Sequence, residues 1–107
     1  MESGELGAIL CELKGKLRDF YNDRLAQLVL YGSQARGDAD PGSDIDVLVV
    51  LYGEVNPSHE LKRVSDIIYD VSYQHDVVVS CVFVAEEVYA RGEGPLIRNV
   101  QREGMNL

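Results

Sequence analysis

The segment that decides the fold spans residues 31–50 and reads YGSQARGDADPGSDIDVLVV. It contains a Gly-Ser pair and, 11 positions after Ser33, two carboxylates, Asp44 and Asp46, that flank a single isoleucine at the start of a valine-rich run. Carboxylates beside a buried strand are costly unless they are paired. The segment therefore raises the question of which positive charge these two side chains face.

The sequence around this segment has the periodicity of alternating helices and strands. Apolar residues recur at three- and four-residue steps over residues 6–20, which predicts an amphipathic helix. Strands are predicted at 25–31, 44–51 and 76–84, where apolar and β-branched residues dominate. Further helices are predicted as one turn at 33–36, a long helix beginning within 56–60 with a buried stripe of Leu61, Val64, Ile67, Ile68 and Val71, and two short helices at 85–90 and 94–104. This order predicts an α/β (α+β) fold in which helices pack on a small mixed β-sheet.

The chain has the size of one domain, residues 1–107, and an acidic composition. Its 18 Asp and Glu residues outnumber 10 Lys and Arg residues, and a net charge of -8 argues against direct binding of nucleic acid. Two cysteines far apart indicate neither a zinc site nor a disulfide framework. We find no secretory leader and no apolar run long enough for a membrane helix, so a cytoplasmic protein is expected.

The two aspartates of the segment form a candidate metal site. Residues two apart in a strand point the same way, so Asp44 and Asp46 lie on one side, about 6.6 Å apart along the chain. Two carboxylates in this position repel one another unless a cation lies between them. Mg²⁺ prefers such oxygen ligands and commonly combines one or two carboxylates with phosphate oxygens. A divalent cation is therefore the hypothesis for this pair.

The Gly-Ser pair forms a candidate phosphate site. Gly32 and Ser33 follow a predicted strand and precede a short helical turn, where free backbone N–H groups and a hydroxyl converge. If this turn and the aspartate pair lie at neighbouring strand ends, one holds a triphosphate and the other holds the metal that bridges it. The combination indicates nucleotidyl transfer.

These motifs resemble a known family. GSQARG followed by SDID is similar to the signature of the polymerase-β-like nucleotidyltransferases, in the minimal form called MNT, and the C-terminal PLIRNVQREGMNL resembles the tail of small stand-alone members. The resemblance implies the polymerase-β-like nucleotidyltransferase fold. It also implies that Gly32 and Ser33 bind nucleotide phosphates, that Arg36 contacts a phosphate or the acceptor, and that Asp44 and Asp46 ligate Mg²⁺.

The family has a third acidic residue on a later strand, which completes the metal site or accepts the proton of the acceptor. Asp76 matches this position, and Asp70 on the preceding helix is a competitor. The resemblance thus implies a catalytic and metal-binding set of Asp44, Asp46 and Asp76.

The resemblance also implies a function and a partner. Small members of this family act as antitoxins of HEPN ribonuclease toxins, and transfer AMP from ATP to a toxin tyrosine with Mg²⁺ as cofactor. Two alternatives are a non-catalytic antitoxin that masks its partner by binding and a stand-alone transferase that modifies a small, aminoglycoside-like molecule. A homodimer or a hetero-oligomer with the toxin is expected.

Overall fold

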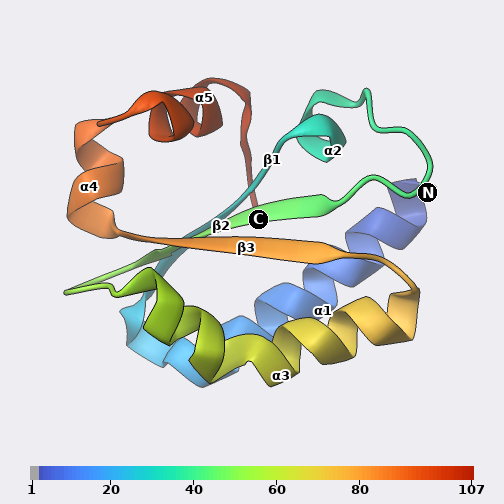
Figure 1. The fold of residues 1–107 in the computed structure, drawn as a ribbon, viewed down its shortest axis with the longest axis horizontal. Helices are drawn as coiled ribbons and strands as arrows, with labels where there is room; N and C mark the ends of the chain where they lie inside the picture. The colour runs from blue at the N-terminus through green and yellow to red at the C-terminus, as the bar shows by residue number, and fades with distance from the viewer. Residues whose placement is uncertain (1–2) are drawn as a thin grey trace.

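The computed structural model describes residues 3–107 and has a four-stranded mixed β-sheet at its centre (Figure 1). The strand order is β3-β2-β1-β4; β1 is antiparallel to β2 and β4, and β2 is parallel to β3. The strands are β1 (Leu25–Tyr31), β2 (Ile45–Leu51), β3 (Val79–Ala85) and β4 (Met105–Asn106). The predicted mixed sheet covered by helices is confirmed.

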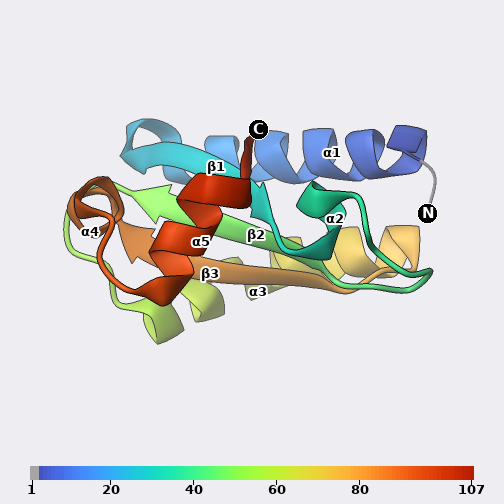
Figure 2. The ribbon, with the colours of Figure 1, turned by 90° about the horizontal axis from the view of Figure 1, so that it is seen from above.

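Helices cover both faces of this sheet (Figures 1 and 2). On one face lie the two long helices, α1 (Ser3–Tyr21) and α3 (Pro57–His75). On the other lie three shorter ones, α2 (Ser33–Arg36), α4 (Glu86–Arg91) and α5 (Pro95–Glu103). A 3-10 turn, η1 (Asn22–Arg24), connects α1 to β1. Because β2 and β3 are parallel, α3 is the crossover that connects them.

The valine-rich run is buried because β2 lies between two apolar clusters. Its odd-numbered residues, such as Val47 and Val49, face the helices α1 and α3. Its even-numbered residues Leu48 and Val50 face the opposite side, where they pack with residues of α5. Residues 47–51 are all 0 % exposed. A strand covered on both faces has this continuous apolar sequence.

Part of the predicted buried stripe of α3 is wrong. Val64 and Val71 are buried, and Ile67 and Ile68 pack partly against the core. Leu61, however, is 46 % exposed. Its neighbour Glu60, which is 2 % exposed, takes the inward position in that turn. The apolar pattern alone does not predict this, because polar partners of Glu60 compensate its burial.

The end of α3 also differs from the prediction. The helix continues to His75, and Asp76 closes it in the left-handed conformation with φ of 51°. The Asp76 N–H donates hydrogen bonds to the carbonyl oxygens of Ser72 and Tyr73. The third strand therefore begins at Val79 and not at Asp76.

The short strand β4 was not predicted, because two residues carry no periodicity. It pairs with Val29 and Leu30 of β1, and the next N–H, that of Leu107, donates to the Leu28 carbonyl oxygen at 2.9 Å. None of the helices within residues 3–107 has the length and apolar character required to cross a membrane.

Candidate active site

The Gly-Ser turn and the aspartate pair meet at one end of the sheet. Tyr31, the last residue of β1, pairs with Asp46 near the start of β2. Gly32 and Ser33 follow Tyr31 directly, and Asp44 precedes β2. Antiparallel pairing thus brings the end of one strand to the start of the next, as the sequence hypothesis requires.

Gly32 is packed against the carboxylate of Asp46. A Cβ atom added at Gly32 would lie 2.5 Å from Asp46 Oδ2, and the residue has φ of 74° and ψ of -157°. This backbone conformation is essentially restricted to glycine. The turn that follows is short: the Arg36 N–H donates to the Gly32 carbonyl oxygen at 3.1 Å, and Gly37 closes the turn. The main chain therefore approaches the acidic pair without an intervening side chain.

The electrostatics of the pair fit a divalent cation. Burial and the charge of Asp44 raise the pKa of Asp46, and the positive charge of Arg36 partly opposes that rise. Asp46 is half-buried and Asp44 is exposed. The side-chain ion pairs found within residues 3–107 include neither aspartate. Two carboxylates that repel one another provide hard oxygen ligands, which are the kind that Mg²⁺ prefers.

Arg36 lies beside the pair and has carboxylate partners of its own. Its Nε donates to Asp38 Oδ2 and its Nη1 to Glu103 Oε2, both at 3.2 Å. Its side chain is 44 % exposed. These contacts tie α2 to α5, and the contact of Arg36 with a phosphate or an acceptor stays a prediction.

The structure does not bring Asp76 together with the aspartate pair. Asp76 is exposed and lines a cavity of about 340 Å³, together with Gly42 and Ser43. Asp70 is exposed on α3. Among the described residues, no group of three or more His, Cys, Asp or Glu side chains could hold a metal ion. The reason is that α3 continues to His75, so Asp76 caps the helix three positions before β3 begins.

The residue that β3 places beside Asp46 is Ser80. No sequence motif predicts a role for Ser80. One signal was available: Ser80 is the first polar side chain after Asp76 in a strand of otherwise apolar residues. The parallel register of β2 and β3, which only the structure provides, is needed to place it next to Asp46.

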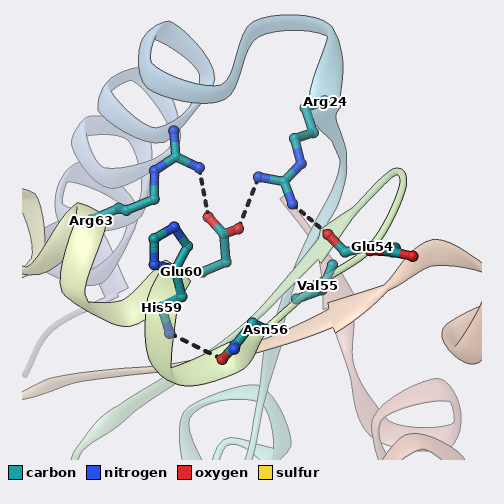
Figure 3. Close-up of a pocket in the computed structure, with 7 residues that line it drawn as sticks. All are labelled: Arg24, Glu54, Val55, Asn56, His59, Glu60 and Arg63. Atoms are coloured by element: carbon teal, nitrogen blue, oxygen red, sulfur yellow. Dashed lines mark hydrogen bonds and ion pairs between the residues drawn. The ribbon is translucent and has the colours of Figure 1, made fainter.

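A second polar cluster lies at the opposite end of the sheet, where β1 begins and β2 ends (Figure 3). There a cavity of about 600 Å³ contains Glu60 between two guanidinium groups. Arg24 Nη1 donates to Glu60 Oε2 at 2.9 Å, and Arg63 Nη1 donates to Glu60 Oε1 at 3.1 Å. The Tyr21 hydroxyl donates to Oε1 at 3.0 Å. This cluster connects α1, η1 and α3, and it is separate from the aspartate pair.

Comparison with known proteins identifies the family. Residues 10–103 match the family model described as "Nucleotidyltransferase domain". The chain belongs to this nucleotidyltransferase domain family. The resemblance to minimal nucleotidyltransferases is thereby confirmed, and the aspartate pair lies in a nucleotidyltransferase domain.

Curated relatives of the domain come from Methanocaldococcus jannaschii. One, named "Putative protein adenylyltransferase MJ0604", is 32% identical over 97 residues, which cover 90% of this chain and 91% of the relative. Another, "Putative protein adenylyltransferase MJ0141", is 31% identical over 84 residues, 78% of this chain and 84% of the relative. The similarity therefore extends over most of both chains.

Solved structures share the fold of the domain. A structure described as a putative minimal nucleotidyltransferase has a TM-score of 0.59 and 25% sequence identity, and covers 95% of each chain. A toxin-antitoxin structure with AMP-PNP has a TM-score of 0.60 at 19% identity, covering 88% of this chain and 68% of that chain. The latter similarity shows the fold alone.

Proposed function

We propose that the domain is an antitoxin that transfers AMP from Mg-ATP to a tyrosine of a HEPN ribonuclease toxin. The observation that carries this proposal is the packing of Gly32 against the carboxylate of Asp46, which unites the turn and the acidic pair in one site. The relatives named protein adenylyltransferases support AMP transfer. The toxin-antitoxin structure with AMP-PNP supports the choice of nucleotide and partner.

The proposed roles are those that the family resemblance implies for these residues. Backbone N–H groups at Gly32 and Ser33 hold the triphosphate, and Asp44 and Asp46 hold Mg²⁺. When bound, Mg²⁺ neutralises charge on the phosphate oxygens. The tyrosine oxygen forms a bond to the α-phosphorus, and the bond from the α-phosphorus to the oxygen that bridges to the β-phosphate breaks. Pyrophosphate leaves, and the phenolic proton is lost to solvent.

Arg36 is the proposed phosphate or acceptor contact of this site. Its positive charge partly opposes the rise in the pKa of Asp46, so Arg36 acts electrostatically on the acidic pair. The pair with Glu103 keeps the side chain beside the site until an anionic ligand competes for it.

A second candidate function is a binding antitoxin that masks its partner without catalysis. The observation that favours it is that the structure unites two carboxylates and that no group of three His, Cys, Asp or Glu side chains within residues 3–107 could hold a metal ion. The two functions differ in one respect that can be measured: covalent transfer of AMP.

The test uses α-labelled ATP and the toxin that co-purifies with the domain. The wild-type protein is expected to label the toxin in the presence of Mg²⁺, and the double variant Asp44→Asn, Asp46→Asn is expected to label it at least about 100-fold more slowly. Asp40→Asn is the matched control, because Asp40 is exposed in the same loop and is not part of the proposed site.

The outcomes separate the two functions. Labelling that survives the double substitution contradicts the proposed transfer. Absence of labelling by the wild-type protein, together with full neutralisation of the toxin by the double variant, favours the masking antitoxin.

A further inference from the structure

The position beside Asp46 on the neighbouring strand is occupied by Ser80. The parallel register pairs these two residues directly, and pairs Ile45 with Val79 before them. A hydrogen bond from the Ile45 N–H to the Val78 carbonyl oxygen at 2.8 Å fixes this register at the very start of both strands. Neighbouring strands lie about 4.8 Å apart, so the Ser80 side chain starts within reach of any cation held by Asp46.

Ser80 and Asp46 project from the same face of the sheet. On β3, Val79 and Phe83 pack in the cluster under α1 and α3, whereas Val82 and Val84 pack in the cluster of Leu48. Side chains alternate along a strand, so Ser80 shares the face of Val82. On β2, Asp46 shares the face of Leu48 for the same reason. Tyr31 of β1 also packs on this face, which gives a row of Tyr31, Asp46 and Ser80 across three strands.

No other acidic residue of the described chain takes this place. Asp76 is the last acidic residue before β3, and it caps α3 in an exposed position. Its N–H donates to two carbonyl oxygens of the helix, so its main chain belongs to the helix end and not to the strand that pairs with β2. Residues 79–85 themselves contain no carboxylate.

We propose that Ser80 is the third group of the metal site, so that the domain holds a divalent cation through two carboxylates and a neutral hydroxyl. This inference rests on the proposed function and specifies its site. Two carboxylates balance the charge of one divalent cation, whereas a hydroxyl adds an oxygen ligand without charge. The site therefore has no carboxylate from β3 to attract a second cation or to accept the proton of the acceptor.

Binding of Mn²⁺, followed by electron paramagnetic resonance, tests this inference without any measurement of activity. Ser80→Asp places a third carboxylate next to the pair and is expected to tighten Mn²⁺ binding on the order of tenfold, since affinity rises with the charge of the ligands. Ser80→Asn is the matched control, because it has nearly the same volume as aspartate and no charge. Asp76→Asn is expected to leave Mn²⁺ affinity unchanged.

Two results would overturn the inference: Ser80→Asp that binds Mn²⁺ no more tightly than Ser80→Asn, or a loss of affinity in Asp76→Asn. Thermal unfolding of each variant checks that it is folded. The double variant Asp44→Asn, Asp46→Asn separates this question from the proposed function. If Mn²⁺ binding survives in that variant, the pair is not the metal site and the proposed function fails, whatever the result at Ser80.

Discussion

Gly32 shows how one residue determines the geometry of the site. Its φ of 74° and ψ of -157° lie in a region that other residues rarely enter, and a Cβ atom would overlap Asp46 Oδ2. Gly37, five residues further on, also has a positive φ, of 81°, but a Cβ atom there would have no heavy atom within 4 Å. A side chain at Gly37 would therefore cause backbone strain alone, whereas one at Gly32 would cause strain and also collide with Asp46.

We expect Gly32→Ala to abolish binding of Mg-AMP-PNP, because the methyl group displaces the carboxylate of Asp46. Gly37→Ala should destabilise the fold by about 1 kcal/mol, the usual cost of a left-handed alanine, and leave binding intact. Calorimetric titration with Mg-AMP-PNP and thermal unfolding measure the two effects. Equal affinities in both variants would contradict the role assigned to Gly32.

At the scale of secondary structure, the cluster around Glu60 fastens α3 to the end of α1 and to η1. Burial on its own would raise the pKa of Glu60, but hydrogen bonds from Arg24 and Tyr21 and the charges of Arg24 and Arg63 outweigh burial, so its pKa is lowered. A lowered carboxylate pKa means that the cluster stabilises the fold above the ordinary pKa of 4.5 and loses this contribution as the pH falls.

We expect Glu60→Gln to lower the free energy of unfolding by about 2 kcal/mol at pH 7, because two guanidinium groups lose their buried partner. The difference from the wild-type protein should shrink as the pH falls below 4.5, because Glu60 of the unfolded chain is protonated there, whereas the folded protein takes up this proton only at its lower pKa. Urea unfolding between pH 3 and pH 7 measures both effects. Glu87→Gln, an exposed position on α4, is the control and should show no such pH dependence.

The elements differ in how well the sequence predicts them. The strand predicted at residues 25–31 matches β1, and the one predicted at 44–51 differs from β2 by one residue, because Gly32 ends the first apolar run and Asp44 precedes the second. The end of α3 was missed because Asp76 takes the left-handed cap that glycine normally takes. The spacing of the motifs predicts that the aspartate pair and the Gly-Ser turn lie together. It does not predict the register of β2 and β3, which places Ser80 beside Asp46.

At the scale of the whole molecule, the site costs stability. Burial and the neighbouring charge of Asp44 raise the pKa of Asp46 above its ordinary value of 3.8, so the folded state binds a proton more tightly than the unfolded state. A raised carboxylate pKa means that stability is lost as the pH rises through this range. Near neutral pH the protein therefore retains an unfavourable charge that its core has to outweigh.

We expect Asp46→Asn to be more stable than the wild-type protein at pH 7, by about 0.5 kcal/mol after solvent screening, or roughly 2–4 °C in Tm. The advantage should vanish below pH 3.8, where the wild-type carboxyl is neutral. Added Mg²⁺ should stabilise the wild-type protein alone, because the proposed metal site needs both carboxylates. Differential scanning calorimetry with Asp40→Asn as the control measures this; a lower Tm for Asp46→Asn at pH 7 would refute the expectation.

The pairing of β4 with β1 has a consequence for biosynthesis. Residues 105 and 106 pair with Val29 and Leu30 on the second edge of β1, although about 75 residues separate them from its last residue. At typical elongation rates of 5–20 residues per second, the ribosome needs roughly 4–15 s to make the intervening chain. During that interval the nascent β1 has an unpaired edge that can accept a strand from a neighbouring polypeptide. Slower translation of the second half of the message should therefore reduce the soluble yield.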